Sequence, residues 1–268
     1  MSDSDEARDS AQSEPPARVD AHLVAGGKYH DIDFARAELL GLLAEHPHVR
    51  VTVWPDYEAA EAICRGAFLV SYTCDVRPSR PAQEAISDWV RGGGRWVALH
   101  GTNAALDLGR PNGVESPRVF PVWARTLGSQ FVAHPPIQPY SVEAADPAHW
   151  LVAGIEAFET DDELYLMEYH GRADLHPLLH THWSGQARGF AEFDWADTES
   201  AHLVQYLRPL GQGAVLYNTL GHCRGHWDMA PVLAYYPTVE RCSWTKPQYY
   251  ELLRRAIRWA LREEPADG

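Results

Sequence analysis

Three histidines come shortly after apolar, strand-like runs that lie far apart in the chain: His30, His100 and His222. Because the carboxyl ends of parallel strands meet at one edge of a sheet, where ligands bind, we expect these side chains to lie together. An imidazole exchanges protons near neutral pH and, in its neutral form, binds zinc and related metals. The chain holds 14 histidines, so chance alone could place one at a strand end. The set of three favours a functional site for proton transfer or metal binding.

The order of the predicted elements determines which edge these histidines share. Short apolar or β-branched runs alternate with helical stretches, some of which begin at Asp or Pro or end before Gly. We expect strands at residues 22–25, 49–54, 67–73, 95–99 and 213–219, and helices at residues 33–43, 57–64, 81–91 and 247–262. Such alternation is typical of right-handed βαβ units. The predicted fold class is therefore α/β, with a doubly wound, mostly parallel sheet and helices on both faces.

The middle of the chain is less regular. Between residues 119 and 209 we expect strand-like pieces at residues 164–169, 177–183 and 203–207. We interpret this stretch as a β-rich insertion that sets substrate choice. Since no linker or repeat interrupts the pattern, we predict one domain, residues 21–263, after a disordered acidic tail, residues 1–20.

Three acids receive local structural interpretations. Asp33 precedes the apolar positions of the first predicted helix, so we expect it to cap that helix. Asp161 and Asp162 stand in a run of acids, and we expect them to form a solvated turn. These carboxylates are therefore left out of the candidate site.

Charge and composition argue against several classes of protein. With 37 acids, 23 bases and a net charge of −14, the chain lacks the basic balance that nucleic-acid binding favours. No run of about 18 apolar residues occurs, which predicts no membrane span. Residues 1–18 lack a basic start and an apolar stretch, so we expect a cytoplasmic protein. The glycines at 92–94 precede a strand instead of a helix, which predicts no nucleotide cofactor.

A series of short motifs occurs in a fixed order along the chain. They are GGKYHD at residues 26–31, GGGRWVALHGTNAA at 92–105, FVAHP at 131–135, DDELY at 161–165, GQGAVLYNTLGH at 211–222 and AIRWA at 256–260. Together they resemble the ThuA-like (trehalose utilisation) family. The resemblance covers nearly all of the predicted domain. It implies a fold of the class I glutamine amidotransferase-like kind, related to flavodoxin-like sheets.

The resemblance also indicates what this chain does not do. The amidotransferase fold places a nucleophilic cysteine on a sharp turn after a central strand, and the corresponding stretch here is residues 98–102, with His100 in the place of the cysteine. An imidazole cannot form the thioester that amide transfer from glutamine needs. We therefore expect no glutamine amidotransferase activity. Cys74 also follows a strand, but a small buried thiol is the favoured interpretation, and an amidase using it ranks last.

The motif residues suggest a division of roles. His30, His134 and His222 match the family's motif histidines and could form a three-histidine site for zinc or manganese. Glu163 is a candidate acid or base, or a fourth ligand. His100 could shuttle a proton or bind a sugar hydroxyl. The predicted catalytic residues are His100, Glu163 and His222.

The resemblance implies a substrate among disaccharides or their 3-keto derivatives. A 3-keto-sugar has an acidic proton next to its carbonyl, so a polarised carbonyl with Glu163 or His100 as base would allow enolisation, epimerisation or elimination. The enzyme would be a lyase, hydrolase or isomerase. Polar and aromatic groups near the motifs are candidates for binding the sugar: Lys28, Tyr29, Asn103, Trp123 and Tyr165.

A second interpretation assigns no turnover to the chain. The protein could be a sugar-binding or scaffold partner of a sugar dehydrogenase that uses the same cleft. The histidine set favours the enzyme, because binding a neutral sugar does not need several titratable imidazoles. Both interpretations expect a small-molecule sugar as ligand, no nucleic acid and no membrane, with a homo-oligomer left open.

Overall fold

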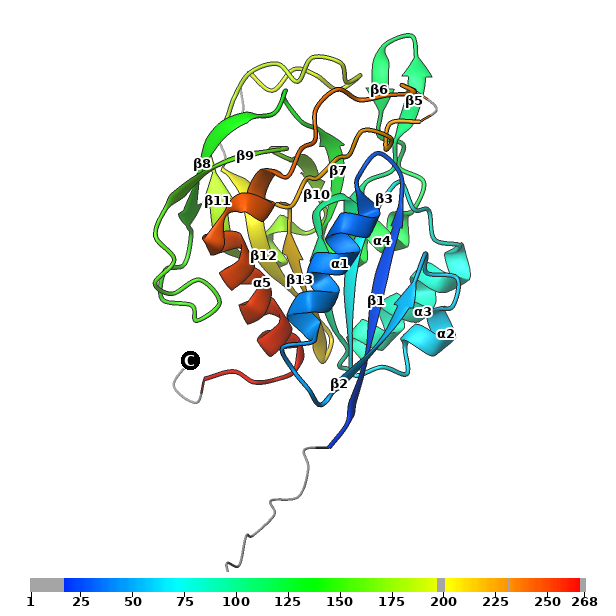
Figure 1. Cartoon of the computed structure of the whole chain (residues 1–268), viewed down its shortest axis with the longest axis vertical. Coiled ribbons are helices and arrows are strands. Elements are labelled where there is room, and N and C mark those ends of the chain that lie inside the picture. The colour runs from blue at the N-terminus through cyan, green and yellow to red at the C-terminus, as the bar shows by residue number, and fades with distance from the viewer. Residues whose placement is uncertain (1–16, 197–200, 231, 266–268) are drawn as a thin grey trace, which may run out of the picture.

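A computed structural model describes residues 17–196, 201–230 and 232–265 of the chain (Figure 1). One half of its central sheet is parallel. The strands of this half are β2 (Val49–Trp54), β1 (Val19–Gly27), β3 (Phe68–Cys74), β4 (Arg95–Leu99) and β13 (Gly213–Asn218), in this spatial order. Each pairs in parallel with its neighbour. All five were expected from the sequence, because each is a compact apolar or β-branched run.

The other half of the sheet is antiparallel. Its strands continue from β13 in the order β12 (His202–Leu210), β11 (His176–Thr181), β8 (Gln138–Ala144) and β9 (Phe158–Asp162). The complete sheet has nine strands and is mixed. The α/β class and the large central sheet are thus confirmed. The antiparallel half is formed by the middle stretch of the chain, where the sequence pattern is less regular.

Helices cover both faces of the sheet (Figure 1). Helices α1 (Ile32–Leu43) and α5 (Pro247–Ala260) pack on one face, and α2 (Ala60–Ile63), α3 (Arg80–Arg91) and α4 (Pro121–Leu127) pack on the other. Alternate residues of β1 serve the two cores, since Leu23 joins the first cluster and Val24 the second. A strand with both faces buried is mostly apolar, and the polar Ser71 and Thr73 of β3 have side-chain hydrogen-bond partners inside the protein.

Several smaller elements lie outside the main sheet, some of them near the carboxyl edge of the parallel strands. The hairpin β5 (Asp107–Arg110) and β6 (Gly113–Glu115) projects beyond this edge (Figure 1). Strands β7 (Ser129–Ala133) and β10 (Leu166–Tyr169) pair antiparallel outside the main sheet. Short 3-10 helices follow β4 at η1 (His100–Asn103), precede β11 at η2 (Arg172–Asp174) and precede α5 at η3 (Cys242–Thr245).

Two boundary predictions are corrected. Helix α1 is capped by Asp31, whose side chain accepts a hydrogen bond from Phe34 N at 3.1 Å, whereas Asp33 lies in the first turn. The cap therefore lies two residues earlier than expected. The predicted acidic tail overlaps β1, which begins at Val19, and its residues 1–16 lie outside the described part of the chain.

Among the helices that the structure describes, none has both the length and the apolar character needed to cross a lipid bilayer.

Candidate functional site

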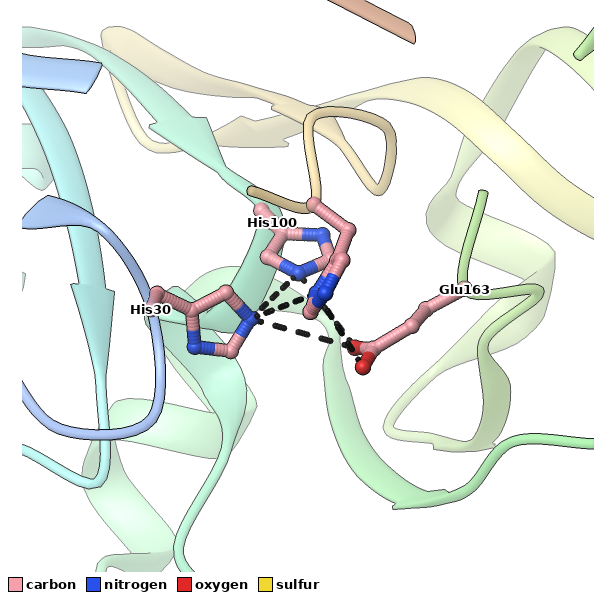
Figure 2. A group of neighbouring side chains, drawn as sticks. His30, His100 and Glu163 are labelled. Carbon is pink, nitrogen blue, oxygen red and sulfur yellow. Dashed lines mark hydrogen bonds and ion pairs between the residues drawn. The ribbon is translucent and has the colours of Figure 1, made fainter. Parts of the chain in front are cut away.

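Three strand ends and one loop bring four side chains into contact. His30 follows β1, His100 follows β4 and His222 follows β13, all at the carboxyl edge of the parallel strands. Glu163 reaches the same point from the loop between β9 and β10. Figure 2 shows His30, His100 and Glu163 directed toward one another from separate segments. The expected convergence of the three histidines is therefore present, and we call these four residues the His–Glu cluster.

The His–Glu cluster is compact and buried. Nε2 of His30 lies 2.8 Å from Nε2 of His100 and 3.1 Å from Nδ1 of His222. Glu163 places Oε1 3.1 Å from Nδ1 of His222 and Oε2 3.4 Å from Nε2 of His100. The donor atoms all lie within 4.8 Å of one another, close enough for all four residues to contact one metal ion. All four residues are at most 5% exposed.

Backbone carbonyls fix the orientation of two imidazoles. Nδ1 of His100 lies 2.7 Å from Thr219 O, and Nδ1 of His30 lies 3.2 Å from Lys28 O. A carbonyl oxygen only accepts hydrogen bonds, so each Nδ1 carries a proton and donates it. In neutral His30 and His100, the Nε2 lone pairs then point into the cluster. This tautomer follows from the hydrogen-bond partners.

Charge within the cluster is distributed unevenly. Burial and the neighbouring histidines lower the pKa of His30 to about 3, although Glu163 opposes this shift. Burial also disfavours a charged His222, but Glu163 and Glu240 outweigh it and raise the pKa of His222 to about 9. Burial would raise the pKa of Glu163, yet nearby His134, His222 and His100 hold it well below its usual value. Without a metal, the cluster combines an ionised carboxylate, a neutral His30 and a protonated His222 at neutral pH.

A buried carboxylate positions the segment that carries His222. Asp162 is 1% exposed and accepts four backbone hydrogen bonds. The donors are Glu163 N at 2.8 Å, Gly221 N at 2.9 Å, His222 N at 3.1 Å and Ser243 N at 3.2 Å. The expected solvated turn is therefore wrong for Asp162, because backbone N–H groups take the place of water around its carboxylate. It ties the Glu163 loop directly to the backbone of His222.

Gly221 is required by the same turn. Its φ is +110°, and a Cβ atom there would lie 2.3 Å from the hydroxyl of Tyr249. Its carbonyl accepts hydrogen bonds from Tyr72 Oη and Trp244 Nε1, each at 2.7 Å. The glycine of the LGH motif is thus explained by backbone conformation and close packing.

His100 is the first residue of η1 and forms a strained turn directly after β4. Its φ is +46°, in the left-handed region that is unfavourable for residues other than glycine. The backbone carbonyl of His100 accepts a hydrogen bond from the buried Tyr217 hydroxyl, and its ring lies 4.7 Å from the Tyr165 ring. Such strain is typical of functional turns that direct a side chain into a site.

A cavity of about 120 Å³ lies against the cluster, with His30 and Glu163 in its wall. Aromatic and aliphatic side chains make up most of the remaining wall, while its polar groups are few. These walls include Tyr29, Cys74, Leu106, Leu108, Phe131, His134, Tyr165, Phe190, Arg224 and Met229. A wider depression of about 630 Å³, which we call the outer depression, shares Tyr29, Leu106 and Leu108 with this cavity and extends along β5.

The predicted sugar-binding residues separate into two groups. Tyr29 lines both the cavity and the outer depression, Tyr165 lines the cavity, and Lys28 lines the outer depression. Asn103 and Trp123 are fully buried and belong to neither wall. The donor groups of both side chains are engaged inside the protein. Asn103 Nδ2 donates to Ser129 Oγ at 2.8 Å, and Trp123 Nε1 donates to Thr102 O at 2.9 Å.

His134 lies at the edge of the cluster instead of within it. Its side chain is 23% exposed, and its Nε2 lies 3.4 Å from Glu163 Oε1. Its Nδ1 donates to Pro135 O at 2.7 Å. The sequence placed His134 among the metal ligands and His100 outside them, whereas the structure gathers His100 with His30, His222 and Glu163.

Sequence reasoning missed two charged residues beside the cluster. Arg224 Nη2 lies 3.6 Å from Glu163 Oε1, and Glu240 Oε2 lies 2.8 Å from His222 Nε2. Arg224 stands two residues after His222, a spacing that could have suggested a shared site. Glu240 lies in an irregular segment and carried no such signal. Cys74 lines the cavity, and burial raises the pKa of its thiol well above the usual value, so it remains protonated.

Comparison with known families decides the relationship that the motifs suggested. The sequence model of the ThuA family, described as trehalose utilisation, matches residues 23–236. The chain belongs to the ThuA family. No match was found among curated proteins.

Solved structures resemble this ThuA protein over nearly its whole length. A ThuA-like protein from Parabacteroides merdae is 14% identical, with a TM-score of 0.66, and the match covers 93% of this chain and 92% of that one. A ThuA-like protein from Bacteroides uniformis is 14% identical, with a TM-score of 0.65 and coverage of 96% and 97%. A β-galactosidase from Rahnella sp. R3 is 13% identical over 93% of this chain but 32% of its own, with a TM-score of 0.54. At these identities the likeness concerns the fold.

Proposed function

We propose that this ThuA protein is an enzyme that transfers a proton next to the carbonyl of an oxidised sugar, with a divalent metal held by the His–Glu cluster. The observation that carries the proposal is the 2.8 Å approach of Nε2 of His30 to Nε2 of His100. With each Nδ1 donating to a carbonyl, the two neutral rings would point lone pairs at each other. In a buried site, such a pair is stabilised by a proton or by a metal ion that both lone pairs face.

The donor set fits a metal of the zinc or manganese type. Imidazole nitrogens from His30, His100 and His222, with an oxygen of Glu163, are ligands that both metals accept. When bound, the ion would act as a Lewis acid that polarises a carbonyl oxygen. The proton that His222 holds in its absence is the one that metal binding would displace.

The geometry favours an exchange of two roles relative to the sequence expectation. His100 is assigned to metal binding, and His134 becomes the proton acceptor. Its Nδ1 donates to Pro135 O, so its Nε2 is free to accept a proton from a ligand in the cavity. Glu163, 3.4 Å away, would stabilise the imidazolium that forms.

The proposed reaction begins with a proton transfer from carbon to nitrogen. His134 Nε2 takes a proton from the carbon next to the sugar carbonyl, and the C–H electron pair moves to give an enolate. Protonation of the enolate by water from the other face, with release of the His134 proton to solvent, gives an epimer. Alternatively, the electrons expel the glycosidic oxygen, which takes the proton from the His134 imidazolium as it leaves, and elimination results.

The surroundings of the cluster support an oxidised sugar as the substrate class. Tyr165 and Phe131 present apolar faces on which a sugar ring packs, and the small cavity has room for one ring. A second ring of a disaccharide would extend into the outer depression, past Tyr29 and toward Lys28. A sugar dehydrogenase that oxidises a ring hydroxyl would supply this substrate.

We extend the proposal to the finer fold class. The strained turn at His100 lies after a central strand, where class I glutamine amidotransferase-like proteins carry their nucleophile. An imidazole at this place excludes the thioester route. The turn at His100 would thus present a metal ligand where class I glutamine amidotransferase-like proteins present a thiol.

Solvent exchange tests the proposed reaction independently of its product. The metal-loaded protein is incubated with a 3-keto disaccharide in D₂O, and deuterium at the carbons next to the carbonyl is followed by NMR. We expect catalysed incorporation that is lost in His134→Gln. Ligand binding without incorporation would overturn the enzyme proposal and support a sugar-binding partner of a dehydrogenase.

A further inference from the structure

Glu240 contacts the His–Glu cluster through the ring of His222. Its Oε2 lies 2.8 Å from Nε2 of His222 and 2.9 Å from a guanidinium nitrogen of Arg224. Its Oε1 accepts a hydrogen bond from Tyr236 Oη at 2.9 Å. Glu240 is therefore held by three donors, although it lies in a segment without regular secondary structure.

The same residue closes a loop. Arg224 N donates to Glu240 O at 3.0 Å, and Glu240 N donates to Arg224 O at 2.8 Å, so residues 225–239 leave and return at one point. Met229, within this loop, lines the cavity. Glu240 therefore closes this loop through its backbone and contacts the ring of His222 through its carboxylate.

The charge of Glu240 suits it to hold an imidazole. The guanidinium of Arg224 and the hydroxyl of Tyr236 both donate to this carboxylate, so the ionised form of Glu240 is paired with a fixed positive charge. An ionised carboxylate only accepts hydrogen bonds, so Nε2 of His222 carries a proton. A lone pair for a metal is then available only at Nδ1, which faces the cluster.

We propose that Glu240 is the positioning residue of the site: it holds the Nε2–H of His222, directs Nδ1 to the metal, and ties the cavity-lining loop to the same ring. This inference deepens the proposed function and rests on it for the metal. A carboxylate behind a metal-binding histidine fixes the ring and raises its basicity, and losing it typically weakens metal binding ~10–100-fold.

Three variants separate this role from general support of the loop. Glu240→Ala removes the acceptor, Glu240→Gln keeps an oxygen that can accept from Nε2–H, and Tyr236→Phe removes one loop contact while leaving the His222 contact in place. Circular dichroism first establishes that each variant is folded. Tyr236→Phe is the matched control, because it removes a hydrogen bond that holds Glu240 in the loop but leaves the contact between Glu240 and His222.

The first measurement is independent of the metal. In protein labelled with ¹⁵N-histidine, the imidazole Nε2–H of His222, assigned with His222→Gln, is followed by NMR. We expect a protected signal in the wild type, Tyr236→Phe and Glu240→Gln, and its loss through solvent exchange in Glu240→Ala. An unchanged signal in Glu240→Ala would overturn the positioning role.

The second measurement is the Zn²⁺ dissociation constant, obtained by competition with a chromophoric chelator. We expect affinity ~10–100-fold weaker in Glu240→Ala, a smaller loss in Glu240→Gln and no loss in Tyr236→Phe. Equal affinity in Glu240→Ala and the wild type would contradict the inference. A wild type that binds no Zn²⁺ would instead contradict the metal in the proposed function, while the NMR result would still decide whether Glu240 holds His222.

Discussion

Nε2 of His30 lies 2.8 Å from Nε2 of His100, while the opposite nitrogen of each ring donates to a backbone carbonyl. Both acceptor lone pairs are therefore directed at one point inside the protein. Beside that point lies the ionised carboxylate of Glu163. Protonated His222 offers one N–H to this point, from Nδ1, and Glu163 and His30 both lie 3.1 Å from that nitrogen. The remaining approach of two acceptors is costly in a buried environment unless a further proton or a metal ion completes it.

The first prediction concerns the carboxylate that positions His222. Asp162→Asn is expected to lower the free energy of unfolding by about 2–4 kcal/mol. An amide has one acceptor oxygen in place of two, so some of the backbone N–H groups that donate to Asp162 would face an NH₂ group and lose their acceptor. Urea denaturation measures the effect. Asp161→Asn is the matched control, since Asp161 is exposed. Equal stability of the two variants would contradict the anchoring role of Asp162.

The second prediction separates metal binding from proton transfer. His134→Gln is expected to keep the metal content of the wild type and to lose turnover by ~10²–10⁴-fold, because it removes only the proton acceptor. His100→Gln is expected to lose the metal itself. Metal content by elemental analysis, together with deuterium incorporation into a keto-sugar, distinguishes them. Loss of metal in His134→Gln with retention in His100→Gln would restore the assignment expected from the sequence.

The third prediction is a pH dependence of the metal-free protein. Folded His222 titrates at about 9, whereas an ordinary histidine titrates near 6.5. Between these values the folded state binds a proton that the unfolded state has released, so folding stability falls as pH rises through this window. Melting temperature measured against pH should show the decline, and His222→Gln should lack it. A wild-type melting temperature that rises over the same window would contradict the pairing of His222 with Glu163.

The fourth prediction tests whether Cys74 is a nucleophile. Burial raises the pKa of its thiol well above the usual value, so little thiolate exists at neutral pH. We expect Cys74 to resist iodoacetamide in the native protein at pH 7.5 and to react after unfolding, as followed by mass spectrometry of the peptides. We also expect Cys74→Ala to keep turnover. Rapid native alkylation together with inactivation would favour an amidase.

The parallel half of the sheet could be predicted because its signals are local. Residues 49–54 and 95–99 form β2 and β4 with the expected bounds, since each is a short apolar or β-branched run between turn residues. The topological rule that parallel strands share a carboxyl edge then brought His30, His100 and His222 together before any contact was known.

The remainder depended on contacts between distant segments. Asp162 resembles a solvated acid in sequence, and only packing against residues 221–222 turns it into a buried acceptor. Trp123 lies close to the motifs but packs in the core at 4.5 Å from the Tyr57 ring. Glu240 reaches His222 through a long irregular loop. Periodicity carries no information about such pairings, which tertiary structure alone defines.

The most direct test of the central claim is a titration of metal-free protein with Zn²⁺, followed by X-ray absorption spectroscopy at the zinc edge. The cluster of His30, His100, His222 and Glu163 predicts one ion per chain, a ligand set of imidazoles with a carboxylate oxygen, and an upward shift in melting temperature. Absence of stoichiometric binding, or a wild-type spectrum that is unchanged in His100→Gln, would contradict it.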